Sequence, residues 1–211
     1  EGVASLKEEG VTRAILWPGA GVGGHCLTKD TYHLERGVAM LGPDRLDYPE
    51  GKESLFTLAR SINDFMPKHM AHLTVEGLKR AGKEVPGSRI ALLGWAFIAN
   101  SDDARNTPSE TYKDLMQQEG ANVMIHDPFV EESGINKDLP TVLKNSDAVA
   151  IFTGHSVYKS FDPVAMKNLT QKSIPVIIDG RNMIDADRFI KEGWVYKGIG
   201  RGDKNNHPIL R

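Results

Sequence analysis

The sequence has little of three things: cysteine, charge of one sign, and long apolar runs. Only one of the 211 residues is cysteine, so the chain cannot form an intramolecular disulfide, and we expect a cytoplasmic protein. The 26 Lys and Arg against 28 Asp and Glu leave a net charge of −2, which argues against a protein that binds nucleic acid or a membrane surface. Its apolar runs are all far shorter than the roughly 20 residues that a transmembrane helix needs.

What remains is an ordinary globular composition, with 40% hydrophobic and 26% charged residues. This length leaves room for one large domain or two small ones. The chain begins with Glu1 rather than Met and shows no clear strand or capped helix at its start. We therefore expect it to begin inside a longer unit.

The first half of the chain contains a helical pattern. Apolar residues recur at three- and four-residue steps over residues 52–82, which predicts a long amphipathic helix. Pro67 falls inside this pattern, and we expect it to kink the helix or to restart it, because proline lacks a backbone donor. Glycine and proline then cluster at residues 82–87 and should end the helix, and we expect a domain boundary near residues 85–87.

After residue 87, short apolar segments alternate with helical ones. Strands are predicted at residues 89–97, 122–127, 148–153, 176–179 and 194–199, and helices at 109–119, 139–145, 163–169 and 185–192. Continuous apolar strands that alternate with helices predict an α/β fold, with a mostly parallel sheet and helices on both faces. We divide the chain into residues 1–86 and residues 87–211.

The segment WPGAGVGGHCLTKDTYHL, residues 17–34, is the densest motif. Residues 19–24 match the dinucleotide pattern G-x-G-x-x-G, but Pro18 interrupts the candidate strand before them, so this interpretation is weak. The glycines would instead let the backbone approach a substrate closely.

A second interpretation starts from the only cysteine. A helix that begins near His25 would place Cys26, Lys29 and Asp30 on one face of its first turn. A helix N-terminus and a nearby ammonium both favour the thiolate, which is the nucleophilic form. The open alternative is that Cys26 is a small buried residue and that Lys29 and Asp30 form a solvated pair. We expect no metal site, because the histidines near Cys26 lack the spacing of a ligand set.

This segment resembles the catalytic cysteine loop of the UDP-glucose, GDP-mannose and UDP-N-acetylhexosamine dehydrogenases. The resemblance continues through residues 63–67, GWAFIANSDDARNTP (94–108), HDP (126–128), IDGRN (178–182) and YKGIGRG (196–202), and so covers essentially the whole chain. WPGAGVGGHC and YKGIGRG look more like the enzymes that act on N-acetylated hexosamines. The family oxidises the C6 hydroxyl of a nucleotide sugar to a carboxylate and transfers two hydrides to two NAD molecules in turn.

The resemblance implies catalytic roles for three residues. Cys26 would add to the intermediate aldehyde, giving a thiohemiacetal and then a thioester. Asp30 matches the acid that positions or activates the hydrolytic water, and Lys29 matches a residue near the cofactor and the cysteine. Arg105 matches an arginine that contacts NAD, although by its sequence alone it could simply pair with Asp102 or Asp103.

For the substrate, the resemblance implies contacts from Gly21, Gly23, Gly24, Phe97 and Arg181. Arg181 matches an arginine that reaches the substrate across the subunit interface, but by its sequence alone it could also cap a strand end. The family usually has a lysine after this phenylalanine, whereas the chain has Ile98. The missing cation implies a different sugar or a different phosphate pairing from the UDP-glucose enzymes.

The resemblance also implies that the chain is the C-terminal part of such an enzyme. Residues 1–86 would be the second part of a central helical dimerisation domain, and residues 87–211 a Rossmann-like domain that binds the nucleotide sugar. We then expect NAD as cofactor, a UDP-linked sugar as substrate and a homodimer through the central helix. The family's NAD-binding domain and the lysine and asparagine that stabilise the oxyanion have no counterpart before Glu1, so we expect these residues alone to be inactive. The alternative is a non-catalytic module that binds a nucleotide sugar or dinucleotide and has a structural cysteine.

Overall fold

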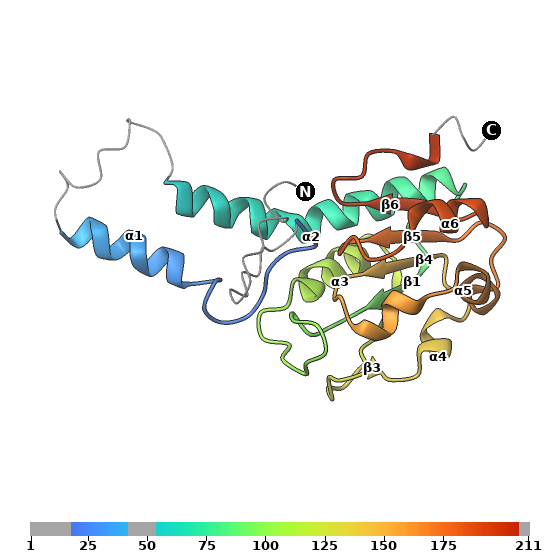
Figure 1. Ribbon diagram of the computed structural model, residues 1–211, viewed down its shortest axis with the longest axis horizontal. Helices are drawn as coiled ribbons and strands as arrows, with labels where there is room; N and C mark the ends of the chain where they lie inside the picture. The colour runs from blue at the N-terminus through green and yellow to red at the C-terminus, as the bar shows by residue number, and fades with distance from the viewer. Residues whose placement is uncertain (1–17, 42–53, 207–211) are drawn as a thin grey trace, which may run out of the picture.

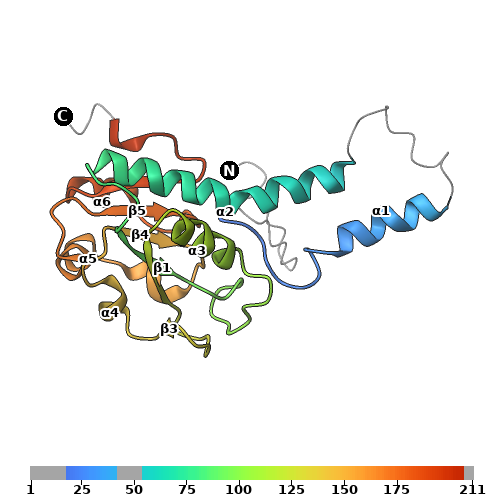
Figure 2. The same cartoon turned by 180° about the vertical axis from the view of Figure 1, so that it is seen from behind.

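The structure is a computed structural model that describes residues 18–41 and 54–206. Two helices, α1 (Asp30–Met40) and α2 (Leu55–Arg80), precede a sheet domain. Figures 1 and 2 show α1 and the first turns of α2 projecting away from the sheet, while the rest of α2 lies along it. In these two ranges, no helix has both the length and the apolar character needed to cross a membrane.

The sheet of the described residues has six strands. They are β1 (Arg89–Leu93), β2 (Asn122–His126), β3 (Ile135–Asn136), β4 (Ala148–Ile151), β5 (Val176–Asp179) and β6 (Val195–Gly198). Their order is β3-β2-β1-β4-β5-β6, and all neighbouring pairs are parallel. In this doubly wound order, ligands bind beyond the carboxyl ends of the strands. The predicted α/β fold with a mostly parallel sheet is confirmed.

Each face of the sheet has its own core, because successive strand residues point to opposite sides. The helices after α2 are α3 (Pro108–Gln118), α4 (Leu139–Leu143), α5 (Pro163–Thr170) and α6 (Ala186–Lys191), with short 3₁₀ helices at Ser156–Ser160 and Lys204–Asn206. On one face, Leu92 of β1 belongs to a buried cluster with Met70 of α2 and Tyr112 of α3. On the other face, Leu93 belongs to a cluster with Leu143 of α4 and Phe189 of α6. Helices therefore cover both faces, as the sequence predicts.

Side-chain caps fix the starts of the helices in the sheet domain. Pro108 occupies the first position of α3, and the Thr107 side chain accepts a hydrogen bond from the Ser109 amide at 3.3 Å. Asp185 precedes α6 and accepts the Asp187 amide at 3.0 Å. The predicted helix starts at residues 109 and 185 therefore agree with the structure to within one residue.

The long helix predicted over residues 52–82 is α2. Ser54 caps its start by accepting the Thr57 amide at 3.0 Å. The helix continues through Pro67 without interruption, so of the two expected outcomes, a kink or a restart, the restart does not occur. Met70 and Leu78, which follow the proline, are buried against the sheet, and this packing offsets the one backbone hydrogen bond that proline removes.

Candidate functional site

The cysteine loop, residues 18–29, runs between the sheet domain and α2. The amide of Ala20 donates to the Gly180 carbonyl at 3.0 Å, beyond the carboxyl end of β5. The amide of Gly24 donates to the Arg105 carbonyl at 2.9 Å, in the segment that connects β1 to α3. The loop therefore lies at the ligand-binding edge of the sheet, as expected for this strand order.

Two glycines in this loop are required by its geometry. Gly24 has a φ of +84°, in the left-handed region that favours glycine. A Cβ on Gly23 would lie 2.6 Å from the Asn106 carbonyl oxygen and 2.7 Å from the Phe97 Cβ. The glycine run thus lets the loop pack directly on the segment after β1.

The start of α1 differs from the prediction. α1 begins at Asp30, so the expected helix start near His25 is wrong. A turn precedes it, in which the Cys26 carbonyl accepts the amides of Lys29 at 3.0 Å and Asp30 at 2.8 Å. The helix does not continue backward through Gly24, because its φ of +84° lies outside the right-handed helical region. Cys26 itself is exposed, which excludes the alternative of a small buried cysteine.

Most of the predicted site residues line one cavity, of about 710 Å³, called here the main cavity. It contains Cys26, Gly21, Gly23, Gly24, Phe97, Arg105 and Arg181. Lys29 lines a different cavity, and Asp30 lines neither of the two described here. The structure therefore brings the cysteine together with the predicted substrate residues and does not bring Lys29 or Asp30 into the same space.

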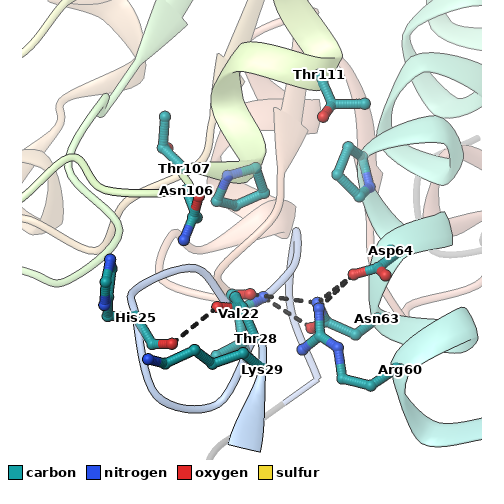
Figure 3. Close-up of a pocket in the computed structure, with 12 residues that line it drawn as sticks. Val22, His25, Thr28, Lys29, Arg60, Asn63, Asp64, Asn106, Thr107 and Thr111 are labelled. Atoms are coloured by element: carbon teal, nitrogen blue, oxygen red, sulfur yellow. Dashed lines mark hydrogen bonds and ion pairs between the residues drawn. The ribbon is translucent and has the colours of Figure 1, made fainter. Parts of the chain in front are cut away.

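Lys29 lines a second cavity of about 460 Å³, on the other side of the cysteine loop. Figure 3 shows Arg60 and Asp64 of α2 pointing toward each other at this cavity, with Asn106 and Thr107 across from them. Arg60 and Asp64 form an ion pair. The lining mixes polar and apolar side chains, and Lys29 is its cation outside the Arg60–Asp64 pair, which suits a hydroxylated or anionic ligand. Over residues 18–41 and 54–206, no group of His, Cys, Asp and Glu is arranged to hold a metal ion.

The two predicted arginines differ in their pairing. Arg105 donates from Nε to Asp103 Oδ1 at 2.8 Å and from Nη2 to Asp103 Oδ2 at 2.5 Å. This pairing, one of the alternatives that the sequence left open, raises the pKa of Arg105, and a charge interaction with Cys26 acts in the same direction. Arg105 therefore lines the main cavity with its charge largely met by Asp103.

Arg181 presents an unpaired charge to the same cavity. Within the part of the chain that the structure describes, its guanidinium makes no hydrogen bond and no ion pair. Burial lowers the pKa of Arg181, while the charge of Asp179 acts in the opposite direction. The turn after β5 is closed by Asp179, whose carboxylate accepts the amides of Arg181 at 3.0 Å and Met183 at 2.9 Å. Arg181 is thus not the residue that caps the strand end, and its side chain is available to a ligand.

Two positions that support the site lie in motifs of the resemblance, but the sequence argument gave them no role. Asn63 on α2 accepts the Val22 amide through Oδ1 at 2.8 Å and donates from Nδ2 to the Val22 carbonyl at 3.2 Å. Asn63 and Val22 line both cavities, so they form part of the wall between them. Asn63 opens the 63–67 stretch of the resemblance, but the sequence alone gave this residue no role.

The second position is Asp127, which follows β2 and is fully buried. Its carboxylate accepts the Trp95 amide at 2.7 Å, the Ala96 amide at 2.9 Å and the His155 Nε2 proton at 3.0 Å. Burial is the largest influence and would raise the pKa of Asp127, but the hydrogen bonds from His155 and from backbone amides together outweigh it and hold the pKa well below its usual value. Asp127 thereby fixes the segment that carries Phe97 into the main cavity.

Comparison with known proteins agrees with this geometry. Residues 91–186 match the UDP-glucose/GDP-mannose dehydrogenase family, UDP binding domain. The crystal structure of an NDP-N-acetyl-D-galactosaminuronic acid dehydrogenase from Methanosarcina mazei Go1 superposes with a TM-score of 0.89 and 58% identity, over 98% of this chain and 44% of that one. UDP-N-acetyl-D-mannosamine dehydrogenase of Pyrococcus horikoshii is 36% identical over 190 residues, which are 90% of this chain and 41% of the relative.

A third relative is named for a different sugar, glucose. UDP-glucose 6-dehydrogenase TuaD of Bacillus subtilis is 30% identical over 200 residues, which cover 90% of this chain and 40% of the relative. The chain thus spans about 40% of the length of the curated relatives that it matches. The resemblance found in the sequence is confirmed. The chain belongs to the UDP-glucose/GDP-mannose dehydrogenase family and matches the C-terminal part of its relatives.

Proposed function

We propose that the chain is the substrate-binding part of an NAD-dependent dehydrogenase that oxidises the C6 hydroxyl of a UDP-N-acetylhexosamine to a carboxylate. One observation carries the proposal: the exposed Cys26 shares the main cavity of about 710 Å³ with Arg181, whose guanidinium makes no ion pair and no hydrogen bond among the described residues. A nucleophile and an unpaired guanidinium in one cavity suit an electrophilic sugar carbon attached to a diphosphate. The names of the Methanosarcina and Pyrococcus relatives support an N-acetylated hexosamine as the sugar.

The main cavity suits the proposed substrate in both charge and polarity. Arg181 would pair with the diphosphate in the bidentate manner that guanidinium allows. Phe97, Ile98 and Met66 give the cavity an apolar wall for the base or the acetyl methyl group. Ile98 is 51% exposed at the position where the family usually has lysine. Arg181 would therefore neutralise the diphosphate charge in place of that lysine. Gly21, Gly23 and Gly24 leave room for the sugar to approach the thiol.

Cys26 would divide the four-electron oxidation into two steps of two electrons each. Its thiolate adds to the C6 aldehyde made by the first oxidation, and the carbonyl oxygen becomes the hydroxyl of a thiohemiacetal. Loss of a hydride and the hydroxyl proton converts this adduct into a thioester. Water then adds to the thioester carbon, and the thiol leaves with the carboxylate as the product. Covalent attachment prevents release of the aldehyde between the two oxidations.

NAD, when bound, accepts the hydride in each of the two oxidations. Lys29, in the second cavity with Asn106 and Thr107, offers a cation and polar groups for its phosphates and riboses. Arg105 would contact the cofactor from the main cavity. One of its hydrogen bonds to Asp103 would be replaced by a bond to the cofactor. The glycines do not form a dinucleotide cradle in this proposal, because the loop already uses amides such as that of Ala20 for contacts within the chain. The role of Asp30 in positioning water rests on the resemblance alone.

The helices suit a homodimer. Leu55, Leu58 and Phe65 on the projecting part of α2 are 74%, 46% and 47% exposed, and an apolar face of this kind is typical of a protein interface. We propose a homodimer through this face, a division of the chain between residues 86 and 87, and a cytoplasmic protein, where a free thiol stays reduced. We also propose that residues 1–211 alone are inactive.

The test uses the protein expressed from its intact reading frame. With UDP-N-acetylmannosamine or UDP-N-acetylgalactosamine, two NADH should form for each uronate, and UDP-glucose should be the poorer substrate by kcat/KM. Release of an aldehyde with one NADH would contradict the cysteine route, and a higher kcat/KM for UDP-glucose would contradict the proposed sugar. Binding of UDP-sugars without any NADH formation would favour the non-catalytic module.

A further inference from the structure

Asn63 contacts the cysteine loop in an unusual way for a helix side chain. Its Oδ1 accepts the Val22 amide proton at 2.8 Å, and its Nδ2 donates to the Val22 carbonyl oxygen at 3.2 Å. One side chain thus satisfies both backbone polar groups of a loop residue, as a neighbouring β-strand would. Val22 and Asn63 are separated by 41 residues in the sequence, so this is a tertiary contact that fixes the loop to α2.

Arg60 adds a contact on the other side of the cysteine. It lies one turn before Asn63 on α2, and its Nη1 donates to the Leu27 carbonyl at 3.3 Å. Its guanidinium is held by the ion pair with Asp64, and only 9% of the side chain is exposed. Together, Arg60 and Asn63 form what we call the α2 clamp, which contacts the loop before Cys26, at Val22, and after it, at Leu27.

The cysteine loop depends on such outside contacts because residues 18–24 have no helix or strand of their own. Contacts to the sheet domain hold Ala20 and Gly24, at 3.0 and 2.9 Å. Val22, between them, is held by Asn63. Gly21 has a φ of +120°, in a region that glycine enters freely. The local backbone at Gly21 therefore does not by itself fix the conformation of the loop. Loss of the Asn63 amide would therefore release the middle of the loop.

The position of the clamp also matters. Asn63 and Val22 line both the main cavity and the second cavity, so the contact is part of the wall that separates them. Cys26 lines only the main cavity, and Lys29 only the second. A shift of the loop at Val22 would move the thiol relative to Arg181 without removing any group that binds the substrate.

We propose that Asn63 is a positioning residue for the oxidation: by holding Val22, it sets where the Cys26 thiol lies in the main cavity. The inference rests on the proposed role of Cys26 as nucleophile. Since Asn63 acts on the loop, its loss should lower kcat and leave sugar binding nearly unchanged. Small displacements of a reacting group are known to reduce rates strongly.

The first test compares Asn63→Ala with Ser61→Ala in the protein expressed from its intact reading frame. Asn63→Ala should lower kcat by about 10- to 100-fold and change the KM for the nucleotide sugar by less than about threefold. Ser61 is the control, because it is exposed and, among the described residues, its hydroxyl donates only to the Leu58 carbonyl of its own helix, at 2.8 Å. Asn63→Asp keeps an acceptor for the Val22 amide and loses the donor, so its kcat should lie between the two, and it also serves if Asn63→Ala fails to fold.

The second test needs no catalysis and uses the 211-residue chain. Cys26 is its only cysteine, so iodoacetamide reports on one thiol. The alkylation rate in Asn63→Ala should differ from the parent rate by at least about threefold, because the loop that carries the thiol is no longer held at Val22. Ser61→Ala should alkylate at the parent rate.

The outcomes separate the two proposals. If Asn63→Ala unfolds at a lower temperature but keeps the parent kcat and alkylation rate, Asn63 is only structural and the inference is overturned. If kcat and KM change together, Asn63 acts on substrate binding and the inference is equally overturned. Uronate formation at the parent rate by a Cys26→Ala enzyme would instead overturn the proposed function, whatever the Asn63 variants do.

Discussion

The sheet domain and the projecting helices bury their apolar residues to very different extents. Every residue of β4 and β5 is buried, and helices cover both faces of the sheet. In contrast, α1 contains no buried residue, and Met40 and Leu55 are 75% and 74% exposed. The sheet domain therefore has a complete core of its own. The projecting helices, defined as α1 and residues 55–66 of α2, carry apolar surface that other protein surface must cover.

The cysteine loop joins these two regions. Ala20 and Gly24 contact the sheet domain, whereas Val22 and Leu27 contact α2. The loop thus takes its shape both from a part with a core of its own and from a part whose apolar surface is exposed. Perturbations of the two regions should therefore have different consequences, and the four substitutions below are ordered by their expected effect on stability.

Asp127→Ala should have the largest effect, and only on the sheet domain. It leaves several buried donors without their acceptor, among them the Trp95 amide and the His155 ring. We expect a loss of about 3–5 kcal/mol in the free energy of unfolding, measured by urea denaturation. Asp102→Ala is the control, because Asp102 is an exposed acid in the segment after β1. A loss below about 1 kcal/mol for Asp127→Ala would contradict the central place of this carboxylate in the fold.

Gly77→Ala should destabilise the contact between α2 and the sheet. A Cβ at Gly77 would lie 2.5 Å from Cγ1 of Val176 in β5, so one of the two elements must move. We expect a loss of about 1–3 kcal/mol in the free energy of unfolding, which is the usual cost of overpacking a core. Unchanged or increased stability would mean that α2 does not pack on β5 as described.

Gly37→Ala is the matched change in the projecting helices. No atom lies within 4 Å of a Cβ at Gly37, so the new methyl group meets no obstacle. Alanine favours the helix over glycine by about 0.8–1 kcal/mol, and amide hydrogen exchange in α1 should slow accordingly. The exchange rates of β1 and β4 should stay the same. Slower exchange throughout the sheet would show that the two regions unfold together, which would contradict the contrast between the sheet domain and the projecting helices.

Leu58→Glu should have the smallest effect on stability and a clear effect on assembly. Leu58 is 46% exposed, so the free energy of unfolding of the sheet domain should change by less than about 0.5 kcal/mol. Light scattering should show that the proposed dimer of the parent becomes a monomer. Val164→Glu is the control, with an apolar residue that is 47% exposed in the sheet domain. An identical mass for Leu58→Glu and the parent would place the interface elsewhere.

The sequence predicts the sheet domain well, because its strands are short, continuous and apolar. The segments predicted at residues 122–127 and 176–179 coincide with β2 and β5 to within one residue. Strand β3 has only the two residues Ile135 and Asn136, too few for a periodic pattern. The helix predicted over residues 52–82 is also present, since its apolar spacing reflects packing against the sheet along its second half.

The candidate site is predicted less completely, because it depends on how distant segments meet. The motifs identified Cys26, Phe97 and Arg181, which do line one cavity. They could not show that Lys29 faces a second cavity, because this depends on a helix that starts at Asp30 and not earlier. The pairing of Arg105 with Asp103 was one of two alternatives, since local spacing alone does not decide between a ligand contact and an ion pair.

Asn63 and Asp127 lie in motifs that the sequence analysis identified, but their contacts could not be predicted from them. Each acts through backbone amides that belong to other elements, and a backbone amide leaves no trace in the residue type. Asn63 reaches Val22 across 41 residues, and Asp127 reaches Trp95 across 32. Such side-chain to backbone contacts are specified by the assembled fold and not by a local pattern.

The central claim is that Cys26 carries the sugar as a covalent intermediate. Rapid-quench mass spectrometry of the intact enzyme with NAD and a UDP-N-acetylhexosamine tests it most directly. We predict a transient adduct with the mass of the sugar nucleotide on the peptide that contains Cys26, and neither adduct nor uronate from Cys26→Ala. Uronate formed at the parent rate by Cys26→Ala would contradict the account.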